Sequence, residues 1–310
     1  MTPFIDQLQT ALGRCGNPVL VGLDPQADLL PEGILPKQRD TGWAELAKGF
    51  SSFCRGVIDV VSPLVAIVKP QAAFFEQVGP SGMAALADVI QYAQSKGLLV
   101  ILDGKRNDIG STAAAYARGF LGREGQSAWG ADAMTVNPYL GDDSLKPFVD
   151  VATQRGAGVF VLVKTSNPGA KMFQDLMSGP RALHQHVAAY VEQLAQQTLG
   201  AGAYGSVGAV VGATHPEQLA QLRVEMPHTW FLVPGYGAQG ATARDTAAAF
   251  DGHGHGAIIN NSRGIIFAHR RGEYAQRFGS GRWQEAVEAA TRDMIDQLRA
   301  ETPAGRLAAR

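Results

Sequence analysis

LLVILDGKRNDI, residues 98–109, is the stretch of sequence that decides the fold. Its first five residues, Leu98–Leu102, are all apolar, and charged residues follow them at once. A short run that is apolar on both faces is typical of a parallel strand buried on both sides. The charged residues of this stretch are therefore expected at the carboxyl end of a buried strand.

Runs of the same kind recur along the chain, and helical stretches separate them. The predicted strands are Val19–Leu23, Leu64–Val68, Leu98–Leu102, Ala131–Val136, Gly158–Val163, Val207–Val211, Trp230–Val233 and Gly256–Ile259. The predicted helices are Trp43–Val61, Ser81–Ser95, Ser111–Leu121, Ser144–Gln154, Arg181–Leu199, Pro216–Val224, Ala241–Phe250 and Trp283–Leu298. This alternation favours a closed (β/α)₈ TIM barrel. An open doubly wound sheet is the alternative, and it is weakened because no G-x-G-x-x-G follows the first strand.

The length fits one such barrel. A chain of 310 residues exceeds the ~150 residues typical of a domain, but α/β barrels reach ~250 residues as one domain. We therefore expect a single TIM-barrel domain over residues 1–310. Within it, residues 1–18 are expected to form a helical extension and residues 302–310 a frayed tail.

Composition and charge exclude several classes of function. With 27 basic and 28 acidic side chains, the net charge is -1, so no basic field favours nucleic acid. No segment approaches the ~20 uninterrupted apolar residues of a membrane span. Two cysteines, Cys15 and Cys54, cannot build a disulfide framework or a four-ligand zinc site. We expect a cytoplasmic protein that binds neither nucleic acid nor membrane.

Charged residues close three of the predicted strands. Asp24 ends the first run, Lys69 follows the second, and Asp103 and Lys105 follow the third. Strand alternation places Asp103 and Lys105 on one face. Because an isolated buried charge is very costly, these four side chains are expected to pair. They form either an active-site array or a purely structural ion-pair network.

This region resembles a known enzyme family. The tract DGKRNDI, residues 103–109, matches the D-x-K-x-x-D-I signature of the orotidine 5′-phosphate decarboxylase family. Further tracts agree in order along the chain: GLDP (22–25), VKPQ (68–71), TVNPY (135–139), PGYGAQG (234–240) and NSRG (261–264). The long second-helix region and the Asn-Pro-Tyr tract resemble the longer bacterial branch of that family, type 2.

The resemblance implies a lyase of pyrimidine biosynthesis that converts orotidine 5′-monophosphate to uridine 5′-monophosphate (UMP) without metal or cofactor. Loss of CO₂ from C6 leaves an electron pair in the plane of the ring, where the ring cannot delocalise it. The protein must then stabilise that charge electrostatically and supply a proton. Lys105 is the expected donor and Asp103 its neighbour at the departing carboxylate. Lys69 and Asp24 are expected to orient the array and to contact the ribose.

The resemblance also places residues at the edges of the site. It implies a homodimer in which Asp108 and Ile109 enter the neighbouring subunit's site, with Thr112 nearby. Arg263 and Gln239 are the expected phosphate ligands, since barrels often bind phosphate after strands seven and eight. Ser166, or Thr165 after a slip of one residue, is expected to contact the pyrimidine. Pro234 would form an apolar wall with Ile109, while the role of Asn137 stays open between the site and a loop cap.

Two other functions remain alternatives. A magnesium-dependent sugar-phosphate decarboxylase or aldolase on the same barrel would need a set of carboxylates, and Glu76 is the nearest acidic residue after the second strand. A barrel that only binds nucleotides would gain nothing from Asp103, Lys105 and Asp108 in one pocket. His253 and His255 are candidate metal ligands, but we expect them in the loop that enters the last strand, at the opposite face of the barrel.

Overall fold

The apolar runs form a closed barrel of parallel strands. The computed structural model describes residues 1–35, 42–123, 125–237 and 240–307, and in it eight strands pair side by side in the closed order β1-β10-β9-β8-β5-β4-β3-β2. These strands are β1 Val19–Leu23, β2 Ile67–Pro70, β3 Leu99–Arg106, β4 Ala133–Val136, β5 Gly158–Lys164, β8 Val207–Val211, β9 Phe231–Val233 and β10 Ala257–Asn261. The TIM barrel expected from the sequence is confirmed.

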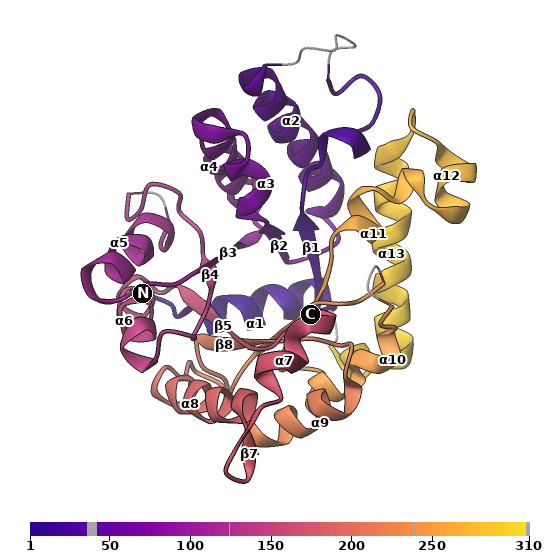
Figure 1. Ribbon diagram of the computed structural model, residues 1–310. Coiled ribbons are helices and arrows are strands. Elements are labelled where there is room, and N and C mark those ends of the chain that lie inside the picture. The colour runs from indigo at the N-terminus through magenta and orange to yellow at the C-terminus, as the bar shows by residue number, and fades with distance from the viewer. Residues whose placement is uncertain (36–41, 124, 238–239, 308–310) are drawn as a thin grey trace.

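Helices surround the barrel on the outside (Figure 1). The helices that follow the strands or connect them are α2 Trp43–Val61, α4 Gly79–Ser95, α5 Gly110–Phe120, α6 Asp142–Arg155, α8 Leu183–Gln197, α9 Pro216–Glu225, α10 Ala243–Thr246 and α13 Trp283–Glu301. Shorter additions are α3 Ala72–Glu76, α7 Lys171–Gln174, α11 Arg263–Ile266, α12 Gly272–Phe278 and the hairpin of β6 Met177–Ser178 with β7 Arg181–Ala182. None of the helices in the described ranges is long and apolar enough to cross a membrane.

Several boundaries differ from the sequence-based expectation. The second strand begins at Ile67, because the amides of Leu64 and Val65 bond back to the carbonyl of Val61 and close the preceding helix. The segment 241–250, expected as one helix, is α10 followed by the 3₁₀ helix Ala247–Ala249. Residues 302–307 were expected in a frayed tail but are ordered. They contain a 3₁₀ helix, Pro303–Arg306, with Ala304 and Leu307 buried.

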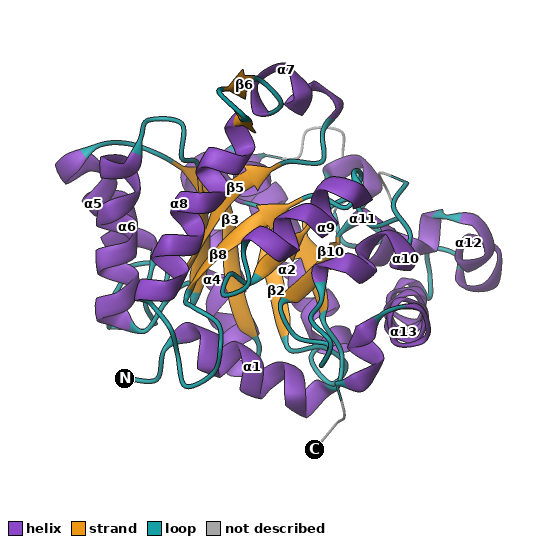
Figure 2. Cartoon of the chain, turned by 90° about the horizontal axis from the view of Figure 1, so that it is seen from below, coloured by secondary structure: helices purple, strands orange, loops and turns teal. Residues whose placement is uncertain are grey.

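Strand alternation divides the core into two layers. Outward-facing residues such as Val21, Val100 and Val161 pack against the surrounding helices. Inward-facing residues such as Leu20 and Ile101 fill the barrel interior. That inner cluster continues into the N-terminal helix α1, Phe4–Cys15, whose apolar face closes one end of the barrel (Figure 2). The opposite end of the barrel is open to a pocket.

Candidate active site

The inward-facing side of the strands becomes polar at their carboxyl ends. Ile67 and Ile101 belong to the inner apolar layer, and Lys69 and Asp103, two residues further on, share their direction along the strand. The same alternation carries β4 from Ala133 to a buried Thr135. Because successive residues of a strand point to opposite faces, each apolar layer residue is followed two positions later by a polar one. The site is therefore the last inward-facing layer of the barrel.

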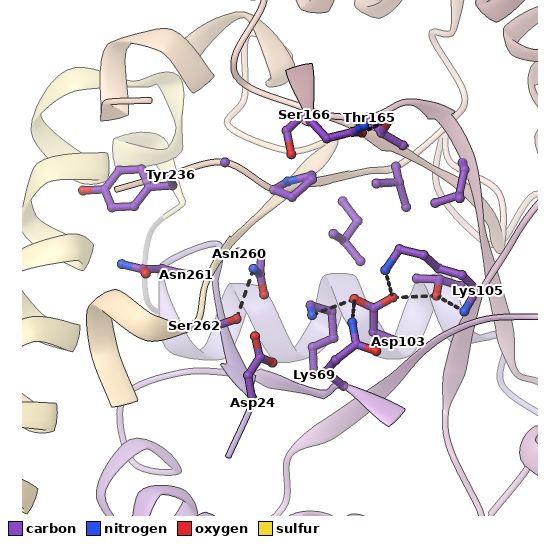
Figure 3. Close-up of a pocket in the computed structure, with 18 of the residues that line it drawn as sticks. Asp24, Lys69, Asp103, Lys105, Thr165, Ser166, Tyr236, Asn260, Asn261 and Ser262 are labelled. Atoms are coloured by element: carbon purple, nitrogen blue, oxygen red, sulfur yellow. Dashed lines mark hydrogen bonds and ion pairs between the residues drawn. The ribbon is translucent and has the colours of Figure 1, made fainter. Parts of the chain in front are cut away.

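Asp103 is the centre of this polar layer, and its carboxylate accepts four hydrogen bonds (Figure 3). One oxygen, Oδ2, accepts from Lys69 Nζ at 2.9 Å and from Gln71 Nε2 at 3.0 Å. The other, Oδ1, accepts from Lys105 Nζ at 2.6 Å and from Thr135 Oγ1 at 2.8 Å. A buried carboxylate with four donors is fully satisfied and fixed in orientation.

Electrostatic interactions keep both Asp103 and Lys69 charged. Burial alone would raise the pKa of Asp103, but the ammonium groups of Lys69 and Lys105 outweigh it and hold that pKa far below its usual value. Burial likewise opposes the charged form of Lys69, yet Asp103 and Asp24 raise the pKa of Lys69 above its usual value. Opposite charges at close range in a low-dielectric site explain both directions.

Asp24 is less well compensated. Burial raises the pKa of Asp24, although nearby Lys69 and a hydrogen bond with Ser262 act against that rise. Its Oδ1 atom is buried, and among the described residues no group donates a hydrogen bond to it. Buried polar atoms normally find a partner, so an exception in a pocket points to a ligand. A ligand hydroxyl would satisfy this oxygen.

Lys105 has an unusual backbone. It has φ of +44°, and no other non-glycine residue in the described ranges has a positive φ. The β3–β4 register shifts between Leu102 and Arg106, and the amide of Lys105 donates to Thr135 Oγ1 at 3.0 Å. Such strained conformations cluster at functional sites. The side chain is about 45% exposed, so its ammonium lies between Asp103 and the open pocket.

The pocket at this end of the barrel has a volume of about 500 Å³, within the range of small-molecule sites. Its charged side is made of Asp24, Lys69, Asp103 and Lys105. Apolar side chains also line it, namely Leu162, Val210, Leu232 and Pro234. An exposed ammonium held by a buried carboxylate in partly apolar surroundings can stabilise an anion that develops on a bound ligand and can give it a proton.

Two hydroxyl residues lie across the cavity from the charged side (Figure 3). Thr165 Oγ1 is already engaged, since it donates to Asn167 Oδ1 at 2.7 Å and accepts from Gln174 Nε2 at 2.8 Å. Among the described residues, no hydrogen bond occupies the Ser166 hydroxyl. A Cβ at Gly212 would lie 2.8 Å from the Ser166 Cα, so only glycine allows this close approach. The geometry therefore favours Ser166 over Thr165 as the ligand-binding hydroxyl.

The remaining wall follows strands β9 and β10. Pro234 lines the pocket, and Arg263, exposed at the start of α11, lines it as well. Gly237 has φ of +69°, a conformation that favours glycine. Gln239, an expected phosphate ligand, lies outside the described residues. Asn261 is buried, and its Oδ1 accepts from the Gly264 amide at 3.1 Å, which fixes the turn that carries Arg263.

Three expected site residues, and Asn137, whose role was left open, lie outside this pocket. Asp108 accepts a hydrogen bond from the Ile109 amide at 2.8 Å, and Ile109 is 55% exposed. Thr112 is exposed on α5. Asn137 caps a turn, because its Oδ1 accepts from the Tyr139 amide at 3.0 Å. None of these four lines the cavity within its own chain.

Other residues of the pocket escaped the sequence reasoning. Gln71, Thr135 and Asn260 line it but were not named as site residues. Each continues the inward-facing alternation of its strand, and that signal would have found them. In the described part of the chain, no group of three or more His, Cys, Asp or Glu side chains could hold a metal ion. Glu76 forms an ion pair with Arg106, while His253 and His255 lie in the loop before β10.

Comparisons with known proteins agree with this picture. The model of the Orotidine 5′-phosphate decarboxylase / HUMPS family matches residues 18–278. A protein of Rhodopirellula baltica named orotidine 5′-phosphate decarboxylase is 52% identical over 301 residues, which cover 96% of this chain and 100% of the relative. A protein of the same name from Deinococcus radiodurans is 46% identical over 86% of this chain and 91% of the relative. The solved structure of Leishmania donovani OMP decarboxylase has a TM-score of 0.74 at 33% identity, with 97% and 98% covered.

Proposed function

This chain belongs to the Orotidine 5′-phosphate decarboxylase / HUMPS family, and we propose that the array of Asp24, Lys69, Asp103 and Lys105 carries out its reaction. The function is the decarboxylation of orotidine 5′-monophosphate to UMP, a step of pyrimidine biosynthesis. The observation that supports our assignment of the array is the buried Asp103 carboxylate, which holds two ammonium groups at 2.9 and 2.6 Å at the edge of the pocket.

Lys105 is the proposed proton donor. When the C6–CO₂ bond breaks, its electron pair stays on C6 in the plane of the ring, and CO₂ leaves. An ammonium beside C6 lowers the energy of that charge, and one of its protons then forms the new C6–H bond. Asp103 would orient Lys105 and lie next to the departing carboxylate. A preorganised group of this kind needs no rearrangement as the charge develops.

The rest of the pocket suits a nucleotide. Asp24, with its unsatisfied buried oxygen, is proposed to accept from the ribose hydroxyls, and Lys69 to orient it. Ser166 would contact the pyrimidine, and Pro234 would form part of the apolar wall. Arg263 lines the pocket and is the proposed phosphate ligand, since a guanidinium binds phosphate oxygens through paired N–H groups. Gln239 is proposed as a second phosphate ligand from the sequence alone.

The protein is further proposed to act as a homodimer. Asp108, Ile109 and Thr112 lie outside the pocket of their own chain, at and just before the start of α5. Ile109, Tyr139 and Leu140 are at least 50% exposed and follow the neighbouring strands β3 and β4. Exposed apolar side chains in one region are typical of an interface. Such an interface would bring Asp108 and Ile109 to the partner's pocket.

The experiment that tests this function measures release of CO₂ and formation of UMP from orotidine 5′-monophosphate by the purified protein. We expect full turnover in the presence of a metal chelator, because the array consists of side chains. Orotidine, which lacks the phosphate, should react far more slowly. Turnover of a sugar phosphate that stops on addition of chelator, together with no UMP, would favour the magnesium-dependent alternative instead.

A further inference from the structure

Lys164 is a buried ammonium outside the catalytic array. It ends β5, where the pairing of β5 with β8 shifts register, and it is 1% exposed. Its Nζ lies 2.5 Å from Oδ1 of Asp175, the residue that directly follows the short helix α7. Removing the partner of a buried charge is strongly destabilising, so this contact must be kept. Asp175 therefore ties the segment 167–182 to the barrel at the end opposite α1 (Figure 2).

Two other elements contact Asp175. Its Oδ1 also accepts from Gln218 Nε2 of α9 at 3.2 Å, and His184 Nδ1 of α8 lies 3.4 Å away. The same His184 nitrogen is 2.8 Å from the carbonyl oxygen of Gln174. The hydrogen bond from Lys164 lowers the pKa of Asp175, so the carboxylate is charged at neutral pH. The backbone at 174–175 is thus held on both sides.

Gln174 transmits this order to the pocket. Its Oε1 accepts from the Thr165 amide at 2.9 Å, and its Nε2 donates to Thr165 Oγ1 at 2.8 Å. Gln174 and Ser166 both line the cavity. Because Thr165 is bonded at its amide and at its hydroxyl, its conformation is fixed, and the direction in which Ser166 faces the pocket is fixed with it.

We propose that Gln174 and Asp175 are positioning residues for recognition of the nucleobase. The Lys164–Asp175 ion pair holds the segment in place, Gln174 holds Thr165, and Ser166 is presented to the base. Neither residue is expected to affect the ribose or the phosphate, whose proposed ligands are Asp24, Arg263 and Gln239. This inference rests on the proposed function, because it assumes that the ligand carries a pyrimidine.

Gln174→Ala tests whether the hydrogen bonds from Gln174 to Thr165 matter for recognition of the base. The measurement is the dissociation constant of UMP and of ribose 5-phosphate, which has the sugar phosphate but no base. Loss of two hydrogen bonds to Thr165 should weaken binding of UMP about tenfold and leave binding of ribose 5-phosphate unchanged. Gln185→Ala is the matched control. Gln185, in the first turn of α8, accepts from the Ala182 amide at the end of the segment at 3.0 Å, and it does not line the pocket. It should leave both constants unchanged.

Asp175→Asn tests the Lys164–Asp175 ion pair and should likewise weaken binding of UMP but not of ribose 5-phosphate. The unpaired Lys164 ammonium of this variant could prevent folding. The double variant Lys164→Met/Asp175→Asn removes that charge, and it should fold and show the same selective loss of affinity for UMP. Equal losses for both ligands, or undiminished UMP binding by Gln174→Ala and the double variant, would overturn the inference. A parent protein that binds ribose 5-phosphate but not UMP would overturn the proposed function instead.

Discussion

Replacing Asp103 by Asn preserves the shape of the side chain at the centre of the array but removes its charge. Lys69, which is 4% exposed, then loses the carboxylate at 2.9 Å and keeps only Asp24. Breaking a buried ion pair on one side costs about 3–5 kcal/mol, and we take the lower end because Asp24 remains. The Lys105 side chain is about 45% exposed, so its lost pairing adds little.

The expected shift in melting temperature follows from the chain length. Unfolding entropy of roughly 2.1 cal/mol/K per residue over 310 residues gives about 0.65 kcal/mol/K. A loss of about 3 kcal/mol therefore lowers Tm by about 5 °C. Turnover should fall by about 10³-fold or more, because Lys105 is no longer held and the charge array is broken.

Asp132→Asn is the matched control for this experiment. Asp132 is also 4% exposed and accepts from the Val100 amide at 2.9 Å, Gln94 Nε2 at 3.1 Å and Arg123 Nε at 2.7 Å. It lies before β4, away from the pocket. Thermal unfolding and UMP release are measured on both variants. Asp132→Asn should lose stability and keep its turnover, and an equal loss of turnover in the two variants would refute the reasoning for Asp103.

Three further results are expected. Asp24→Asn should raise Tm at pH 7, because the raised pKa of Asp24 makes its ionised form a cost to the fold. This gain in Tm should grow as the pH rises from the usual carboxyl pKa of 3.8 towards the raised pKa of Asp24. A lower Tm of the variant at pH 7 would contradict this. Arg263→Ala should weaken binding of UMP by about 1.5–3 kcal/mol per lost hydrogen bond and leave binding of uridine, which has no phosphate, unchanged. Equal losses of affinity for UMP and uridine would show that Arg263 does not bind the phosphate. Mixing inactive Lys105→Ala and Asp108→Ala subunits should restore activity, up to about half of the sites in each mixed dimer; a mixture that stays inactive after demonstrated subunit exchange places Asp108 in its own subunit's site.

The barrel and the charged side of its pocket follow from patterns that the sequence displays. The apolar runs predict the strands, and period-two alternation turns Lys69 and Asp103 inward beyond the apolar layer. The same rule applied one step further reaches Gln71 and Thr135. Gln71 was missed because uncharged polar side chains after a strand are also common in ordinary turns. Thr135 was missed because it lies within the predicted strand Ala131–Val136.

Other features depend on contacts between distant parts of the chain. The positive φ of Lys105 arises where β3 shifts register against β4, and no local pattern encodes it. A buried Lys164 demands a counterion, but its sequence neighbourhood does not say that Asp175 supplies it. The order of residues 302–307 likewise comes from burial of Ala304 and Leu307 in the core, although the segment contains a proline and a glycine.

The central claim is that the Lys105 ammonium stabilises the charge at C6 and protonates it. The most direct measurement is the rate of UMP formation from orotidine 5′-monophosphate by Lys105→Ala, with Tm and UMP binding measured on the same sample. Because the side chain is about 45% exposed, the variant should fold with little change in Tm. We expect it to bind UMP and to lose turnover by at least about 10²–10⁴-fold, the contribution typical of a general acid. Turnover within about tenfold of the parent rate by the folded, UMP-binding variant would contradict the account.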